Sequence, residues 1–578
     1  MERRLLLVFA LTFLVIVLFQ PVLKKYLPQA PASPPQTQSQ NPPAPVPPQP
    51  SVVPSEVAPA KPAKAQPTPA PAAKQATSES ETVIENDLYR ITFTNRGAQV
   101  KSWILKKFDD DKGQPLELVN NTAAPIFGYP LSLWTYDESQ RNKLNSALYL
   151  ASASGTLHAP ATLTFEYADQ DFTVRKSFRF DDSYVVNVET SAQFKGSQLA
   201  AYPAWPAGFG DQTTFAFYHA GHIEYQYNGD TVRLDLKKIS GGNTLHLPMN
   251  WGGVTDQYFA AVFLPEDSQN SAMVTLHNTI NLPKDPQKPN PQDTAPADVL
   301  GAAVGNPRGP TVERLYTGPK SLRVLESIPV PTVVGAPQDL RALVNFGFFG
   351  VIARPLFLWL KWTYEKIVSN WGWAIVIQTL IINIALLPLR ISSMKSALKM
   401  QRIQPQMNAI KEKYKKYGMR DPRRQEMNTE IGELMKREGV SPLGGCLPLL
   451  IQMPFLFAYY SMLGAALDLR HAHWLWIRDL SAADPYLILP IGIVITMLFT
   501  QRMTPQAGMD PSQQKMMNLM MPVMMGVISY RLAAGLCLYW SVGNLIMIAQ
   551  QTVLNRTSLG REMREMAAKR ARKKEKAG

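Results

Sequence analysis

Residues 370–390 read NWGWAIVIQTLIINIALLPLR. Most of this stretch is apolar, and it is long enough to cross a bilayer as a helix. It nevertheless carries the amides Gln378 and Asn383 in its middle and ends with Pro388 and Arg390. Because lipid offers an amide no hydrogen-bond partner, we expect this segment to turn its polar side chains toward protein or water.

Further apolar runs indicate a membrane protein with several crossings. After the basic residues Arg3 and Arg4, an apolar run covers residues 5–19. We interpret residues 1–27 as a signal-anchor helix that stays attached, although a cleavable signal peptide also fits that length. Four more runs, the last two of them short, lie at residues 446–467, 486–502, 516–531 and 535–551. The sequence predicts six crossings, five of them in an α-helical core at residues 370–555.

The charges of the connecting loops predict the orientation. Loop 390–442 has thirteen Lys or Arg against six Asp or Glu, whereas loop 468–485 has two against three. Basic loops stay on the cytoplasmic side, so the first loop is predicted to be cytoplasmic and the second exported. The basic tail at residues 556–578 and the N-terminus are then both cytoplasmic, which agrees with an even number of crossings.

Two regions of different character separate the first crossing from the second. Residues 28–80 are rich in Pro, Ala, Gln and Ser and predict an extended linker. Residues 81–335 alternate apolar and polar side chains, and Asn228-Gly229-Asp230 stands between two such runs, which is a strong hairpin signal. We therefore expect a large antiparallel β-sandwich. It contains more acidic than basic residues, so it is expected on the exported, periplasmic side.

Two amphipathic segments complete the predicted organisation. Residues 336–369 mix aromatic residues with Arg354, Lys361 and Lys366, which indicates a helix lying at the membrane interface. Residues 391–440 repeat apolar residues at helical spacing on either side of a break at 418–422, which predicts a cytoplasmic helical hairpin. Its basic residues include Lys399, Arg402, Lys411, Lys413, Lys415 and Lys416.

The sequence gives no sign of catalysis. The histidine pairs His219/His222 and His471/His473 have no cysteine or clear carboxylate partner at metal-ligand spacing. No phosphate-binding loop or nucleophile motif occurs. We predict no enzyme activity, no metal site and no cofactor.

Polar side chains instead recur along the predicted crossings. At 100° per residue, and if Pro388 does not deflect the helix far, Thr379, Asn383 and Arg390 share one face, while Gln378 points to a different contact. Ser541, Asn544 and Gln551 form a second stripe, and Gln452 lies on a third crossing. Hydrogen bonds between helices explain single residues of this kind. For the whole set we favour a shared, hydrated cavity.

Several longer motifs resemble one family, the YidC membrane protein insertases in their long Gram-negative form. The resemblance covers most of the chain, and its motifs are specific. They are Asn370-Trp371-Gly372, Gln404-Pro405, Gln452-Met453-Pro454, Gly535-Leu536, Asn544-Leu545, residues 251–265 (WGGVTDQYFAAVFLP) and residues 441–448 (SPLGGCLP).

The resemblance implies a function. Such proteins insert inner-membrane proteins and help them to fold, alone or with the Sec translocon, through a hydrophilic groove open to the cytoplasm and to lipid. On this basis Thr379, Met453, Pro454, Tyr539 and Trp540 correspond to client-contact positions. The implied partners are nascent membrane proteins, the lipid bilayer, the ribosome, the signal recognition particle with its receptor, and the translocon components SecYEG and SecDF.

One position departs from the family pattern. Members generally carry an arginine in the groove where an ungapped count places Asn383 here. An amide lacks the positive charge that draws acidic client segments inward. Arg390 lies on the same predicted face, about 10 Å nearer the cytoplasm at about 1.5 Å per residue, and we hypothesise that it takes over part of that role.

Two other functions remain as alternatives. A transporter or channel also needs polar stripes along its helices, although we find neither an inverted repeat nor a mid-membrane acid. Alternatively, the sandwich could bind or process carbohydrate, but a fold of this type does not determine a function. A docking or scaffolding role for the sandwich is our preferred interpretation.

Overall fold

Alternating apolar and polar residues in the first part of the chain form strands, as expected. The computed structural model describes residues 73–110, 112–210, 221–284, 290–331, 338–417, 421–440, 447–503, 511–558, 561–562 and 565. The predicted signal anchor at 1–27 and nearly all of the predicted linker at 28–80 lie outside these residues.

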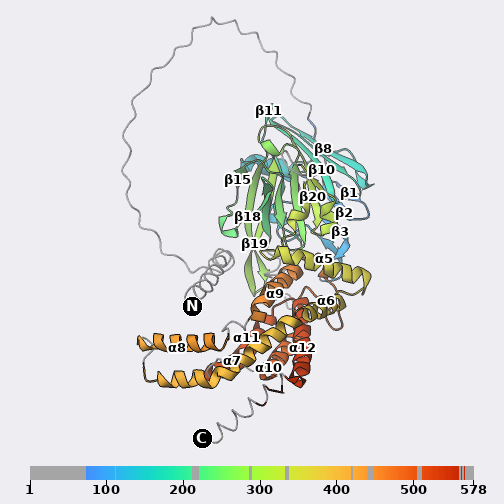
Figure 1. Ribbon diagram of the computed structural model, residues 1–578. Helices are drawn as coiled ribbons and strands as arrows, with labels where there is room; N and C mark the ends of the chain where they lie inside the picture. Colours follow the sequence, from blue (N-terminus) through green and yellow to red (C-terminus); the bar gives the residue numbers. More distant parts are fainter. Residues whose placement is uncertain are drawn as a thin grey trace, which may run out of the picture. The chain divides into compact units, whose positions relative to one another are not determined.

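Three large sheets, almost entirely antiparallel, form most of the β-sheet region (Figure 1). A small fourth sheet pairs β21 (Pro329–Val330) with β22 (Gln338–Asp339). The largest sheet has the strand order β14 (Asp230–Arg233), β13 (His222–Tyr227), β16 (Trp251–Thr255), β17 (Phe259–Pro265), β20 (Thr311–Pro319), β10 (Val185–Phe194), β9 (Phe172–Phe180), β8 (Ala161–Ala168) and β6 (Leu150–Ala151). β11 (Ser197–Gln198) pairs with β10 beside this row. The second is β4 (Pro115–Glu117), β3 (Gln99–Asp109), β2 (Tyr89–Thr94), β1 (Glu81–Glu85), β7 (Gly155–His158). The third is β15 (Asn243–His246), β18 (Ala272–Pro283), β19 (Thr294–Gly305), β12 (Tyr202–Trp205), β5 (Ser132–Trp134).

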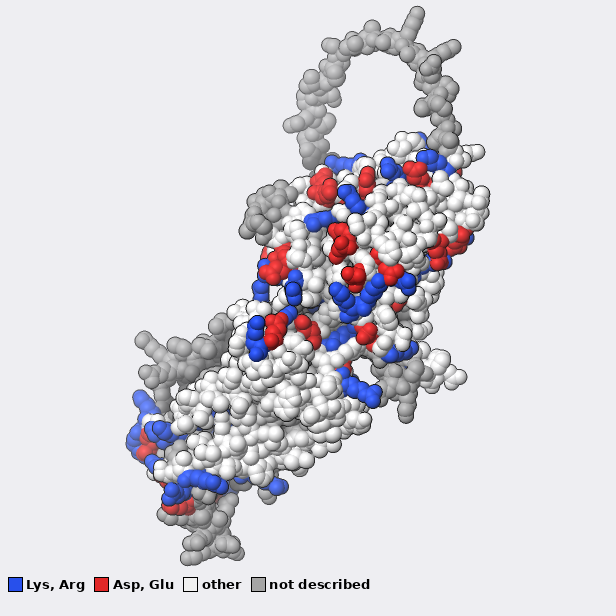
Figure 2. Space-filling view, turned by 90° about the vertical axis from the view of Figure 1, so that its right-hand side faces the viewer, with Lys and Arg blue, Asp and Glu red and all other residues white. Residues whose placement is uncertain are grey.

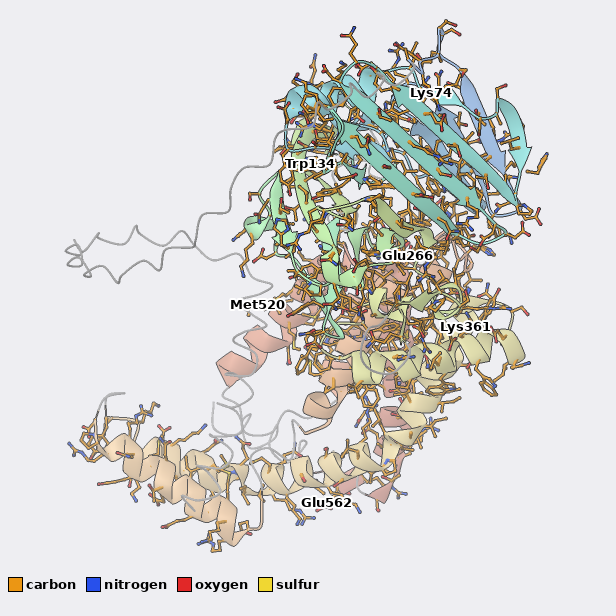
Figure 3. The ribbon with its side chains drawn as sticks, turned by 90° about the horizontal axis from the view of Figure 1, so that it is seen from above. Lys74, Trp134, Glu266, Lys361, Met520 and Glu562 are labelled. Carbon is orange, nitrogen blue, oxygen red and sulfur yellow. The ribbon has the colours of Figure 1, made fainter. Side chains whose placement is uncertain are left out.

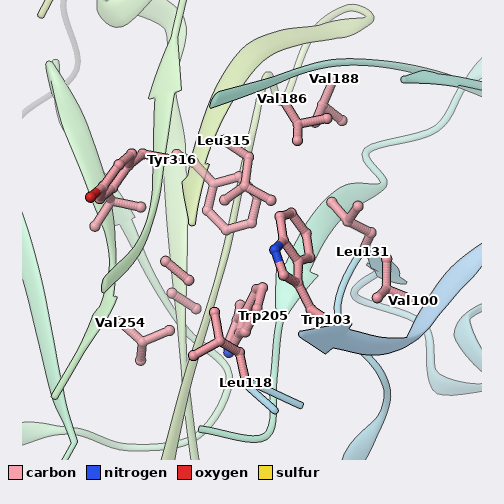
Figure 4. Packing of buried hydrophobic residues seen from close by; sticks show 14 of the residues in the cluster. Val100, Trp103, Leu118, Leu131, Val186, Val188, Trp205, Val254, Leu315 and Tyr316 are labelled. Carbon is pink, nitrogen blue, oxygen red and sulfur yellow. The ribbon is translucent and has the colours of Figure 1, made fainter. Parts of the chain in front are cut away.

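The inward residues of these sheets meet in one core. Trp103 of β3 and Trp205 of β12 are fully buried, with ring centroids 5.8 Å apart (Figure 4). The same cluster contains Leu315 and Tyr316 of β20. Because the three sheets share one apolar interior, they form a sandwich, and the predicted fold of this region is confirmed.

The predicted hairpin at Asn228-Gly229 also forms. β13 pairs antiparallel with β14, and Tyr227 lies opposite Asp230. Asn228 and Gly229 have φ angles of 50° and 84°, which is the left-handed pair that a two-residue hairpin of this type needs. The local sequence was therefore sufficient to fix both the turn and its register.

The second part of the chain is helical, in agreement with the predicted apolar runs. The helices are α5 (Gly350–Lys366), α6 (Trp371–Ala385), α7 (Leu387–Lys413), α8 (Arg423–Arg437), α9 (Leu447–Ala465), α10 (Ile488–Met503), α11 (Pro511–Ser529) and α12 (Ala534–Arg556). None of the described helices is by itself long and apolar enough to cross a bilayer. Taken together as a bent pair, α6 and α7 are long and apolar enough. On the face drawn in Figure 2, Lys, Arg, Asp and Glu cover the sandwich but are nearly absent from most of the helical part.

One expectation about the second crossing, at residues 370–390, was wrong. We assumed that Pro388 would leave the helix nearly straight, but the chain breaks at Leu386 and bends by 48° between α6 and α7. Proline has no amide hydrogen for the carbonyl four residues earlier, and its ring collides with that carbonyl. The predicted continuous face from Thr379 to Arg390 is therefore carried by two helices.

The helices pack through apolar faces. Leu356 and Leu360 of α5 are buried against α6 and α9, whereas Val351, Leu358 and Trp362 on the same helix are exposed. The predicted hairpin is formed by α7 and α8, which share a small core of their own (Figure 1). The residues of this core are Ile403, Met407, Tyr414, Met427, Ile431, Leu434 and Val440.

Candidate functional site

Polar side chains of α6 face α12 where a glycine allows close approach. A β-carbon added to Gly543 of α12 would lie 3.9 Å from Nδ2 of Asn383 and 4.0 Å from Cγ2 of Thr379. Both side chains bond within their own helix: Oγ1 of Thr379 donates to the Ile375 carbonyl at 2.6 Å, and Nδ2 of Asn383 donates to the Thr379 carbonyl at 2.8 Å. Internal bonds of this kind satisfy the side-chain donors without linking the two helices.

Gln550 connects the broken ends of α6 and α7. Its Nε2 donates to the Asn383 carbonyl at 3.2 Å, while its Oε1 accepts from Nη1 of Arg390 at 2.6 Å. Arg390 is half-buried, and no carboxylate lies within 4.0 Å of it among the described residues. The arginine therefore lies at the same helix interface as Asn383, despite the bend, and is held there by an amide and not by a counter-ion.

Two further polar residues of α12 continue this interface toward α10. Nδ2 of Asn544 donates to Oγ1 of Thr496 at 3.1 Å. Oγ of Ser541 is buried and has no hydrogen-bond partner in the described part of the chain. We call Thr379, Asn383, Arg390, Ser541, Asn544 and Gln550 the polar seam. Most of it is closely packed, since Thr379, Asn383 and Asn544 are 0%, 7% and 4% exposed. The proposed hydration of the seam stays a prediction.

Gln378 serves a separate contact, as predicted. Its Nε2 donates to the Leu356 carbonyl of α5 at 3.0 Å, and its Oε1 accepts from the Tyr459 hydroxyl of α9. The ring of Tyr459 stacks on Tyr539 of α12 with centroids 4.0 Å apart. Gln378 is fully buried and joins α5, α6 and α9.

The remaining predicted client-contact residues lie on other surfaces. Gln452 and Pro454 of α9 are half-buried, and the Met453 side chain is 37% exposed. Trp540 is half-buried and packs against the apolar cluster of the helical core. Among the described residues, no hydrogen bond joins these four side chains to the polar seam.

The predicted basic residues of the hairpin are mostly exposed. Lys399, Arg402, Lys413, Lys415 and Lys416 are exposed, and Lys411 is half-buried. Three of them pair with acidic residues: Lys413 with Glu430, Lys415 with Glu412, and Arg402 with Glu562. These pairs are solvated and contribute little to stability, so the hairpin keeps a largely available basic surface.

Sequence reasoning missed three residues of this region. Gln550 lies seven residues after Gly543, on the same side of α12, and this spacing was a usable signal. Thr496 and Tyr459 lie in predominantly apolar runs and gave no such signal, because their partners are set by how the helices pack. Within the described residues, no cluster of His, Cys, Asp and Glu could hold a metal ion.

Comparison with known proteins identifies the family. Residues 81–359 match the family described as YidC periplasmic domain, and residues 362–561 match the family described as 60Kd inner membrane protein. The YidC membrane protein insertase of Wolinella succinogenes is 35% identical over 71% of this chain and 70% of its own length. That of Bordetella avium is 30% identical over 85% and 84%.

A solved structure, described as an active YidC insertase with its first transmembrane domain resolved, is 18% identical, with a TM-score of 0.34. The match covers 84% of this chain and 95% of that chain. The relatives, which are named as insertases, lend no support to the transporter alternative. The chain is thus an inner-membrane protein with a periplasmic domain, and it belongs to the YidC family of membrane protein insertases.

Proposed function

We propose that the chain inserts membrane proteins by admitting the polar segment of a client into the polar seam. Polar groups at that depth replace part of the hydration that the client loses, which shortens the distance the segment must travel through hydrocarbon. The client's apolar helix then moves into lipid past α9 and α12, where Met453, Pro454, Tyr539 and Trp540 lie. No nucleotide is needed, because burial of that helix in lipid drives the step.

The proposal rests on one observation: two polar side chains inside the described part of the helical core lack the hydrogen-bond or charge partner that such groups normally have. Among the described residues, Ser541 Oγ is buried without a hydrogen-bond partner, and Arg390 is half-buried without a carboxylate. Buried polar groups normally have partners, so water or a client group is expected to serve these two. An arginine without a counter-ion suits acidic client segments, and it stands in for the charge that Asn383 lacks.

The topology and partners follow from the charge distribution. We place six crossings in the membrane, both termini in the cytoplasm and the sandwich in the periplasm as a docking domain. The basic hairpin then faces the ribosome, the signal recognition particle and its receptor, while neighbouring SecYEG and SecDF cooperate with the insertase in the membrane. No residue is assigned a catalytic role, and no cofactor is required.

Insertion by the purified full chain tests this function. Proteoliposomes containing the chain should insert a single-span client with a short acidic translocated segment without nucleotide, as measured by protection of that segment from protease. Empty liposomes of the same lipids are the control. Uptake of a solute coupled to an ion gradient, with no protected client, would establish the transporter alternative instead.

A further inference from the structure

The hairpin carries a groove with an acidic lining. The groove has a volume of about 530 Å³ and is lined by Tyr414 at the end of α7 and by residues of α8, including Glu426, Glu430 and Glu433. The spacings of four and three place these glutamates in one stripe along the helix. Neither lysine nor arginine is among the described residues that line the groove. A hairpin that is basic as a whole thus has one acidic surface.

The acidic stripe is available to a cationic partner. Glu426 and Glu433 are exposed, and neither forms an ion pair with another described residue. Only Glu430 is paired, with Lys413 at 3.1 Å, and the same lysine lies 5.1 Å from the centroid of the Tyr414 ring. The end of the groove at Tyr414 therefore already attracts one cation.

The segment after α12 begins beside this hairpin. Nη2 of Arg402 on α7 donates to Oε1 of Glu562, which Figure 3 labels beside the hairpin. This contact fixes the start of the tail on the same side of the membrane as the groove. Beyond it, outside the described residues, residues 569–576 read KRARKKEK, with six cations and one acid.

The tail is long enough to reach the groove. Tyr414 follows Arg402 by twelve residues, which is a distance of about 18 Å along the axis of α7 at about 1.5 Å per residue. From Glu562 to Lys569 the tail has seven residues, which span up to about 23 Å when extended. The first cation of the basic run can therefore arrive at the groove without any movement of α7 or α8.

We propose that the basic run at residues 569–576 docks in the acidic groove of its own hairpin, where its lysines and arginines pair with Glu426 and Glu433. Charge complementarity selects a cationic segment, and tethering by the Arg402–Glu562 contact gives this segment a local concentration that a free partner lacks. The proposal goes beyond the insertase function and does not depend on it.

Spin-label distances in the full chain test the docking. Cys446 and Cys537 are first replaced by alanine, and labels are attached to cysteines introduced at Asn428, which is exposed beside the groove, and at Ala571 in the basic run. In lipid nanodiscs we expect a narrow distribution of short distances. It should broaden and lengthen in about 1 M salt, where the screening length falls to about 3 Å.

Two matched pairs of substitutions distinguish docking in the groove from a general electrostatic attraction between the basic run and the hairpin. The pair E426Q and E433Q removes charge from the groove and should abolish the short distances. The pair E412Q and E438Q removes the same charge from exposed hairpin positions outside the lining and should leave them in place. Amide exchange of α8 checks that the hairpin stays folded in both variants.

Three results would overturn the proposal. The first is a broad, long distribution in the chain that carries only the two labels. The second is an equal effect of the two pairs of substitutions. The third is the same short distance in a mixture of singly labelled chains, because the tail would then occupy the groove of a second copy.

Discussion

Replacing Gln378 by leucine is expected to lower the free energy of unfolding of the helical core by about 3 kcal/mol. The substitution removes two buried hydrogen bonds, the one from Gln378 to the Leu356 carbonyl of α5 and the one from the Tyr459 hydroxyl of α9 to Gln378. Losing the acceptor of a buried hydroxyl costs about 1–3 kcal/mol and losing the second bond of a helix carbonyl about 1 kcal/mol, while leucine fills a similar volume. Thermal unfolding of the full chain in nanodiscs, followed by tryptophan fluorescence, measures the loss.

A second substitution isolates the hydrogen bond. Tyr459→Phe removes the hydroxyl but keeps the ring that stacks on Tyr539. The double variant Q378L/Y459F should lose less stability than the sum of the single variants, since the hydroxyl stranded by Q378L is then absent. If Q378L were as stable as the unsubstituted chain, Gln378 would not be the link between α5, α6 and α9 that we describe.

Replacing Arg390 by glutamine is expected to slow the insertion of clients with acidic translocated segments about tenfold, equivalent to about 1.4 kcal/mol. Arg390 is held by Gln550 alone and has no carboxylate partner among the described residues, so its charge remains available to a client. Clients whose translocated segment is neutral should be affected little. Arg390→Lys should keep part of the activity, because it retains the charge but loses the planar fork.

The control for this prediction lies on the same helix. Lys395 is exposed on α7 and can be replaced by glutamine with the same change in net charge. Protease protection of acidic and neutral clients in proteoliposomes provides the measurement. Equal slowing of both clients by R390Q would indicate damage to the fold, and equal slowing by K395Q would indicate a general surface-charge effect; either result would contradict the assigned role.

Much of the architecture could be predicted because it follows from local patterns. Period-two alternation located strands such as β8 and β9, and the Asn228-Gly229 turn fixed the pairing of β13 with β14. Helical spacing of Met and Ile located both helices of the hairpin and most of its core. The 48° bend at Leu386 was not predicted, since a proline lowers the cost of a bend without setting its angle.

The sequence predicted which polar residues belong to the candidate site, but it did not predict which residues they bind. The sequence singled out Thr379, Asn383 and Arg390 because polar groups are rare in apolar helices. It could not assign Gln550 as the residue that binds both Asn383 and Arg390, because that contact depends on where two separate helices cross. Nor could it foresee that Thr379 and Asn383 would bond to their own helix backbone.

Reaction of single cysteines with a membrane-impermeant thiol reagent added from the cytoplasmic side tests most directly whether water enters the polar seam. Cysteines at Thr379, Asn383 and Asn544 are compared with one at Leu380, an apolar position that is 43% exposed on the same helix as Thr379, after Cys446 and Cys537 have been replaced. We predict that all three seam positions react many times faster than Leu380→Cys. Rates no higher than that of Leu380→Cys would contradict a seam that admits water and clients.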